Sequence, residues 1–236
     1  YNFDIWASNN LYFWESLRSK VFPMKFIFNP SNEGSSIAVY MGTPNRPNDY
    51  WEIPVTEKTP VVDAGTKGLL DKIEQVEEAI IHEFGHVLHI TMGIPQYSGI
   101  YEEVLADTTH LVVTKVPYFM PSYVGEYKSE IKKAMDENQE YPGFIDYLTK
   151  ALRISSNQGI RDFSTNNNLL YPEVYELPNS YLVSSMINHF LYKLSKDIDL
   201  DTIGSSVFEL MYESKEIFAS PDINIFLVAL AKKLKE

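Results

Sequence analysis

The sequence has no cysteine among its 236 residues. This absence excludes disulfide bonds, thiolate metal ligands and a cysteine nucleophile, so metal binding or catalysis must use other side chains. Long hydrophobic runs are also missing. No apolar stretch reaches the roughly eighteen residues of a membrane span, so we expect no membrane-spanning helix.

Basic residues are scarce as well. Lys and Arg number 20 against 32 Asp and Glu, which gives a formal net charge of −12. The phosphates of nucleic acid and the headgroups of anionic membranes repel such a chain, so we expect neither as a partner. The charge favours neutral or cationic substrates instead.

The most informative stretch runs from Ile80 to Met92 and contains a His-Glu-x-x-His pattern. His82 and His86 are four residues apart, so on a helix both imidazoles lie on one face and can converge on one cation. Glu83 lies about a hundred degrees round the helix, where its carboxylate can reach a water held by the metal. The pattern therefore combines two zinc ligands with a general base.

The surroundings of this pattern support a buried helix that begins near Leu69. Apolar residues recur there at steps of three and four and predict a core-facing side, at Ile73, Val76, Ile80, Phe84, Val87 and Leu88. A small residue at Gly85 would let a neighbouring backbone approach closely.

A third candidate ligand, Glu103, follows after a break at Gly93-Ile94-Pro95. A second helix can return antiparallel from this break and present Glu103 to the two histidines. Asp107 lies one turn beyond on the same face, where it could accept the free ring N–H of a metal-bound histidine. We favour Glu103 over its neighbour Glu102 because only Glu103 has an aspartate four residues on.

These residues resemble the gluzincin zinc metallopeptidases, which include the thermolysin-like enzymes and the zinc aminopeptidases. The resemblance implies that His82, His86 and Glu103 bind zinc, that Glu83 polarises the zinc-bound water, and that Asp107 orients His82. The connection from His86 to Glu103 is shorter than in the family's best-known members.

A tyrosine in the C-terminal half resembles the one that binds the oxyanion in the aminopeptidase branch. This resemblance gives Tyr181 the role of donating a hydrogen bond to the tetrahedral intermediate. Tyr171, Tyr175 and His189 are alternatives. Two further histidines lie near the ligands in the sequence. His89 is interpreted as a packing residue or an outer partner of a ligand, and His110 as a hydrogen-bonded interior or edge histidine or an outer partner.

Length predicts a single domain, and the helices and strands expected along the chain make it a mostly helical α+β fold. By resemblance the fold is zincin-like, with a small antiparallel or mixed sheet and the motif helix in an N-terminal lobe of about residues 1–93. A helical lobe of about residues 94–236 follows. In the N-terminal lobe we expect an aromatic-rich helix over 5–22, strands over 24–29 and 36–41, and a long loop over 42–68 with room for a short strand at 51–53.

The edge strand of such a sheet pairs with an extended substrate in the resembling family. Residues Ile37, Ala38, Val39 and Tyr40 are therefore the candidate substrate-binding strand, with a core hairpin as the alternative. In the C-terminal lobe we expect helices over 100–115, 124–137, 144–152, 203–212 and 222–235, another helix capped at 178–180, and a polar loop over 161–168. Asp199 or Asp201 is expected to cap the helix over 203–212.

These features together predict a zinc-dependent metallopeptidase that acts on a peptide or protein substrate with one Zn²⁺ per chain. The alternative is a catalytically inactive zincin-like module for binding or regulation, which the short ligand connection favours and Glu83 opposes. A ferrous oxygenase with two histidines and one carboxylate matches the ligand count but leaves Glu83 unexplained.

The start of the chain at Tyr1 lacks an initiating Met and the features of a signal peptide, so we interpret it as a mature form or an excised domain. The absence of cysteine from a hydrolase is typical of bacterial exoenzymes. We therefore expect a secreted or cell-surface bacterial protein.

Overall fold

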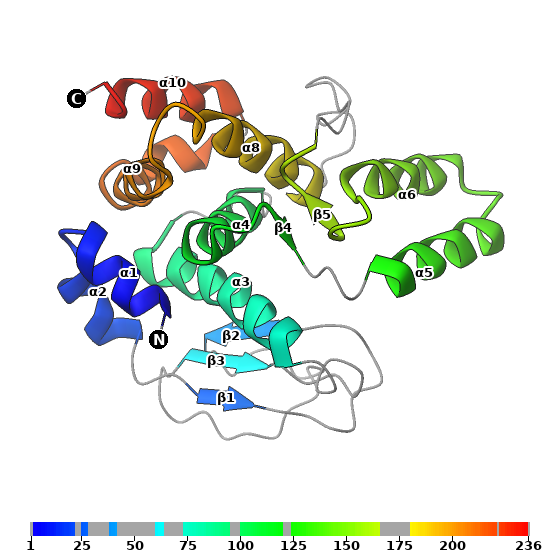
Figure 1. The fold of residues 1–236 in the computed structure, drawn as a ribbon, viewed down its shortest axis with the longest axis horizontal. Helices are drawn as coiled ribbons and strands as arrows, with labels where there is room; N and C mark the ends of the chain where they lie inside the picture. Colours follow the sequence, from blue (N-terminus) through cyan, green and yellow to red (C-terminus); the bar gives the residue numbers. More distant parts are fainter. Residues whose placement is uncertain are drawn as a thin grey trace.

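Two packed helices, α3 (Ile73–Met92) and α4 (Ile100–Thr114), lie at the centre of the computed structural model (Figure 1). The structure describes residues 2–21, 25–27, 38–41, 60–63, 73–94, 100–119, 124–165, 180–220 and 222–235. α3 ends at Gly93, whose φ of 68° is a left-handed conformation that glycine adopts without strain. α4 agrees with the helix predicted over 100–115.

The N-terminal aromatic segment forms two helices, α1 (Asn2–Asn10) and α2 (Trp14–Val21), so the prediction of one helix over 5–22 is wrong. The break follows Asn10, whose side-chain amide donates to the main-chain oxygen of Trp6. Such a bond competes with the helical hydrogen bonds of the backbone and favours a helix end. The side chains of Trp6, Phe13 and Trp14 are buried in the core, whereas Tyr12 is exposed.

A three-stranded mixed sheet lies against α3 (Figure 1) and has the order β1-β3-β2. β3 (Pro60–Asp63) runs parallel to β1 (Lys25–Ile27) and antiparallel to β2 (Ala38–Met41). β3 is not among the predicted strands, because a four-residue strand that starts with proline, in a segment rich in turn residues, shows no alternation. The short strand expected at 51–53 lies outside the described residues.

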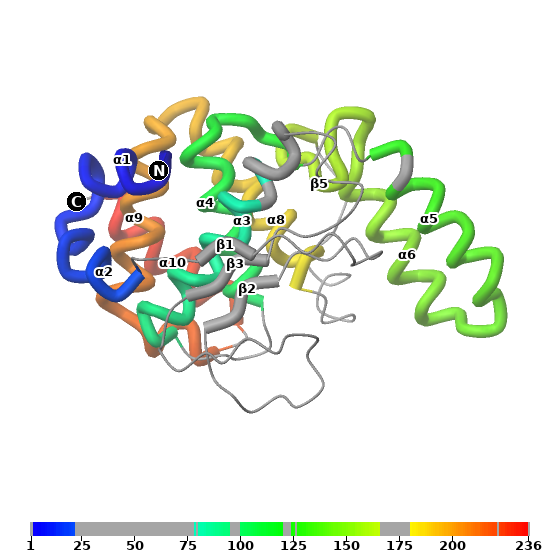
Figure 2. Tube along the Cα trace, turned by 90° about the horizontal axis from the view of Figure 1, so that it is seen from below, coloured from blue at the N-terminus to red at the C-terminus, as the bar shows by residue number. Residues whose placement is uncertain are grey.

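A helical hairpin, α5 (Val124–Glu137) and α6 (Pro142–Ile154), is inserted between two short paired strands, β4 (Tyr118–Phe119) and β5 (Arg161–Asp162). Figure 2 shows both helices side by side at the end of the molecule opposite α1 and α2. Buried residues between them, Ile131, Leu148 and Ala151, form a small cluster of their own. The ribbon of β4 and β5 thus links the hairpin to the centre of the fold.

The C-terminal part consists of α8 (Ser180–Leu194), α9 (Leu200–Glu213), the short 3₁₀-helix η2 (Lys215–Ala219) and α10 (Ile223–Lys233). Asp199 caps α9, because its side chain accepts hydrogen bonds from the main-chain N–H groups of Asp201 and Thr202. Asp199 is one of the two residues predicted to cap this helix. α8 packs along α4, so this region covers the side of α4 that faces away from α3 (Figure 1).

One cluster of buried apolar residues joins the N-terminal helices, α3, α4 and the C-terminal helices. Its largest fully buried side chains include Trp14, Tyr101, Phe163, Phe208, Phe218 and Phe226. The prediction of a mostly helical fold with a small sheet is confirmed, whereas the lobe boundary near residue 93 stays a prediction. Within the described ranges, no helix is both long enough and apolar enough to span a membrane.

Candidate metal centre

The helix α3 presents three polar side chains of the His-Glu-x-x-His pattern at its inner surface. His82, Glu83 and His86 are all buried, although Phe84, Val87 and Leu88 around them pack into the apolar core. Burying polar groups among apolar ones costs free energy unless they find partners. For the two histidines, the partners come from α4.

α3 and α4 run antiparallel, so His82 faces Asp107 while His86 faces Glu102 and Glu103. The helices touch at Gly85, where an added Cβ would lie 2.4 Å from the Cα of Ala106. The backbone approach expected at this glycine is therefore present, and it brings the polar residues of the two helices within contact.

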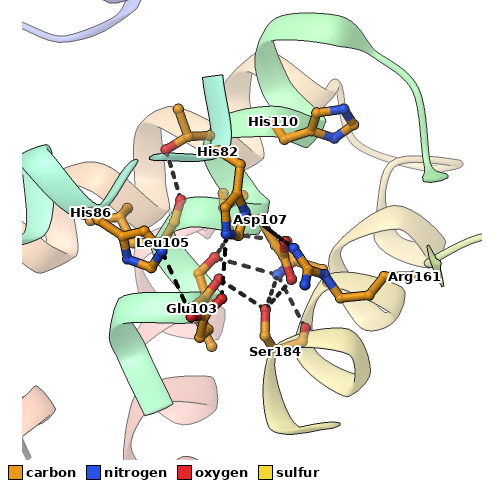
Figure 3. A network of polar contacts seen from close by, with 12 residues as sticks. His82, His86, Glu103, Leu105, Asp107, His110, Arg161 and Ser184 are labelled. Atoms are coloured by element: carbon orange, nitrogen blue, oxygen red, sulfur yellow. Dashed lines mark hydrogen bonds and ion pairs between the residues drawn. The ribbon is translucent and has the colours of Figure 1, made fainter. Parts of the chain in front are cut away.

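The three predicted ligands converge at one point (Figure 3). Oε2 of Glu103 lies 3.4 Å from Nε2 of His82, and Oε1 lies 3.7 Å from Nε2 of His86. Two ligands bound at about 2.0–2.1 Å in a tetrahedral site are about 3.3 Å apart, so these separations suit a small divalent cation. The three residues could hold a metal ion, since their ligand atoms all lie within 4.8 Å of one another.

The other ring nitrogen of each histidine faces a carboxylate outside this cluster. Nδ1 of His82 is 3.0 Å from Oδ1 of Asp107, and Nδ1 of His86 is 3.4 Å from Oε1 of Glu102, without hydrogen-bond geometry in the second pair. Asp107 thus lies where the sequence analysis expected it. The two neighbouring glutamates face different ring nitrogens of His86. Glu103 faces Nε2, together with the other candidate ligand, and Glu102 faces Nδ1.

Charges around the site shift the protonation of several groups. Burial lowers the pKa of His82, but Asp107 and Glu103 outweigh it and raise this pKa to about 9. Burial acts to raise the pKa of Asp107, yet Arg161 and His82 hold it well below its ordinary value. Burial also raises the pKa of Glu83, against the opposing effect of the two histidines. A carboxylate with a raised pKa is a stronger base.

Arg161 is a site residue that the sequence analysis missed. The predicted polar loop over 161–168 begins instead with β5, and the guanidinium of Arg161 is buried at the site. Its Nη2 donates to Oδ1 of Asp107 over 2.7 Å, and its Cζ lies 4.5 Å from the ring centre of Phe119. A single arginine in a polar stretch carries no periodicity that could have revealed this position.

Tyr181 lies at the edge of the same cluster. Its side chain is partly exposed, and Cζ of Arg161 is 5.2 Å from the centre of its ring. Glu103 is the main cause of a raised pKa for Tyr181, and burial adds to it, so the hydroxyl keeps its proton. Of the alternatives, Tyr171 and Tyr175 lie outside the described residues. His189 uses its Nδ1 to donate to the main-chain oxygen of Phe163, over 2.7 Å.

The remaining two histidines are buried beside the site. His89 lies near Glu102, and burial lowers its pKa to about 4. His110 points away from the ligands (Figure 3), and burial lowers its pKa to about 3. His110 is interior, as one of the expectations had it, and neither of its ring nitrogens has a hydrogen-bond partner among the residues that the structure describes, so its hydrogen bonding stays a prediction.

The candidate substrate-binding strand lies partly within the described ranges. Ala38, Val39 and Tyr40 belong to β2, whereas Ile37 lies outside them. β2 stands at an end of the strand order and contacts α3, the helix that carries the histidines. Its role in substrate binding stays a prediction.

Comparison of the chain with protein-family models, with curated proteins and with solved structures gives no match. Function is therefore inferred from the site itself. Two imidazoles and a carboxylate surround one point, the buried Glu83 adjoins His82 in α3, and no fourth ligand from the described residues joins the group. Catalytic zinc sites have three protein ligands of these kinds.

Proposed function

We propose that this chain is a zinc-dependent metallopeptidase of the gluzincin type with a zincin-like fold. The observation that carries the proposal is the placement of Nε2 of both His82 and His86 within 3.7 Å of the carboxylate of Glu103. Nitrogen and carboxylate ligands in this combination are those of catalytic zinc sites with three protein ligands. The neighbouring base Glu83 favours hydrolysis over the ferrous oxygenase chemistry that the same ligand set can support.

The ion, when bound, would supply a Lewis acid that polarises the scissile carbonyl and acidifies a water molecule. Glu83 accepts a proton from the attacking water and delivers it to the leaving nitrogen as the peptide bond breaks. Its burial and raised pKa suit both halves of this transfer, because the group binds the proton more readily than an exposed glutamate does.

The oxyanion that develops on the carbonyl needs a donor as well. Tyr181 stands beside Arg161 near Glu103, and its raised pKa keeps the hydroxyl protonated and able to donate. Preorganised donors of this kind contribute about 10²–10³ in rate. We assign this role to Tyr181, and we assign binding of the extended substrate main chain to the outer edge of β2.

The rival function is an inactive module that uses the same site for binding or regulation. Glu83 separates the two, because a structural metal site needs no base. We also propose that the protein is secreted by a bacterium or displayed on its surface, because the sequence contains no cysteine.

The test compares wild type with Glu83→Gln on a defined mixture of synthetic peptides, with cleavage read by mass spectrometry. Zinc content is measured on both proteins. The proposal predicts equal zinc content and at least a hundredfold slower cleavage by the variant, in line with the 10²–10⁴ that a general base contributes. Equal cleavage rates would refute the role of Glu83. Zinc binding without any cleavage by wild type would favour the inactive module.

A further inference from the structure

A chain of buried polar side chains on α8 lies behind the candidate ligands. Ser184 and Asn188 are one turn apart, and neither has any exposed surface. Their hydrogen bonds run to α4, the helix that carries Glu103 and Asp107 (Figure 3). Polar groups buried between two packed helices cost free energy unless they are bonded, so the direction of these bonds is informative.

The bonds have a definite order. Oγ of Ser184 lies 2.6 Å from Oδ2 of Asp107 and 3.0 Å from the main-chain oxygen of Glu103. A hydroxyl carries one proton, and the nearer, charged carboxylate is the stronger acceptor. Nδ2 of Asn188 in turn donates to Oγ of Ser184 over 3.2 Å. The order is therefore Asn188 to Ser184 to Asp107.

The amide of Asn188 is itself held in place. Its Nδ2 also donates to the main-chain oxygen of Ser184 over 3.1 Å, and that oxygen can only accept. Its Oδ1 lies 3.0 Å from Oγ1 of Thr108, whose hydroxyl lies 2.7 Å from the main-chain oxygen of Val104. These contacts fix the amide with its nitrogen toward Ser184. The hydroxyl of Ser184 consequently accepts from Asn188 and keeps its own proton for Asp107.

The two oxygens of Asp107 have different partners. Oδ1 faces Nδ1 of His82 at 3.0 Å and receives Nη2 of Arg161 at 2.7 Å. Oδ2 has Ser184 as its hydrogen-bond donor among the described residues. The hydroxyl of Ser184 thus fixes the rotation of the carboxylate, and with it the direction in which Oδ1 meets the ring of His82.

We propose that Ser184 and Asn188 are positioning residues of the metal centre. They hold Asp107 in the orientation that fixes the ring of His82, and they thereby raise the metal affinity of a site whose ligand atoms they do not contact. Outer partners of metal-bound histidines affect affinity about 10–100-fold. The inference rests on the metal-binding part of the proposed function and is independent of peptidase activity.

α8 supplies a matched control in the next residue. Ser185 is as fully buried as Ser184, but its hydroxyl has no hydrogen-bond partner within the described part of the chain. Ser185→Ala therefore removes the same atom from the same helix without breaking the chain to Asp107.

The experiment measures the zinc dissociation constant of wild type, Ser184→Ala and Ser185→Ala by competition with a chromophoric chelator. The visible spectrum of each Co²⁺-loaded protein reports ligand geometry, and thermal unfolding of each metal-free protein reports stability. We expect Ser184→Ala to bind zinc about tenfold more weakly and to shift the Co²⁺ bands. Ser185→Ala should match wild type in both.

A purely structural role for Ser184 would lower the unfolding temperature and leave the zinc affinity and the Co²⁺ spectrum unchanged, and that result would overturn the proposal. If Ser184→Ala does not fold, Asn188→Ala takes its place, with a smaller loss of affinity in the same direction as the supporting result and an unchanged affinity as the refuting one. Failure of wild type to bind zinc would refute the metal centre and this inference together.

Discussion

Gly85 of α3 and Ala106 of α4 bring the two helices of the site into backbone contact, with a would-be Cβ of Gly85 2.4 Å from the Cα of Ala106. The contact lies between the two histidines on α3 and between Glu103 and Asp107 on α4. The separation of the candidate ligands therefore depends on the absence of a side chain at Gly85.

Gly85→Ala is expected to destabilise the fold by about 1–3 kcal/mol, since the added methyl forces the helix backbones apart. It should also weaken zinc binding. Gly125→Ala is the control, because Gly125 lies on the exposed side of α5 with nothing within 4 Å of its would-be Cβ. Alanine is the better helix former by about 1 kcal/mol, so this variant should be neutral or more stable. Urea unfolding measures the stability of both variants, and equal stability of the two would contradict the packing argument.

Glu102→Ala is expected to weaken zinc binding by about 10–100-fold without abolishing it, because Glu102 faces the outer nitrogen of His86. Glu102→Gln keeps an oxygen next to this ring nitrogen and should lose less affinity. Titration with a competing chelator measures each affinity. Complete loss of zinc in Glu102→Ala would instead make Glu102 a ligand.

The metal-free protein should lose stability as the pH rises from 6.5 to 9. An unfolded histidine titrates near pH 6.5, whereas His82 in the fold titrates at about 9. Its bound proton therefore stabilises the fold fully below about pH 6.5, by about 3 kcal/mol at most, and this contribution disappears as the pH passes through 9.

Thermal unfolding across this pH range measures the effect. In the zinc-loaded protein the metal replaces the proton, so the fall should be absent and the stabilisation by zinc should grow over the same window. His82→Asn should likewise remove the dependence. A metal-free protein whose unfolding temperature stays constant from pH 6.5 to 9 would speak against the raised pKa.

Arg161→Met is expected to destabilise the protein by about 3–5 kcal/mol, because it removes the buried guanidinium that pairs with the buried carboxylate of Asp107. Arg18→Met is the matched control: Arg18 also pairs with an aspartate, Asp4, but its side chain is 48% exposed. Exposed ion pairs contribute about 0–1 kcal/mol. Chemical denaturation of the two variants should separate them clearly, and similar losses would mean that Arg161 is not needed to balance Asp107.

The sequence predicted the part of the site that local helical periodicity encodes. His82, Glu83 and His86 share one helix, and Glu103 and Asp107 share the next, so spacing alone places each set on a common face. Antiparallel packing of two consecutive helices then brings the sets together. Most helices were predicted from the same helical periodicity of the sequence.

The parts that it did not predict depend on contacts between distant segments. Arg161 reaches Asp107 through the short pairing of β4 with β5, which leaves no pattern in the sequence. Ser184 and Asn188 left a weak pattern: two polar residues one turn apart on a helix side whose buried residues are mostly apolar. Such residues need partners in the core, and that requirement alone could have marked α8 as a neighbour of the site.

The most direct test of the metal centre is elemental analysis of the purified chain, with Glu103→Ala prepared in parallel. We predict one zinc per wild-type chain and its loss in the variant, because Glu103 supplies one of the three converging ligands. A wild-type chain that contains no metal and takes up none when zinc is added would contradict the metal centre and, with it, the proposed peptidase.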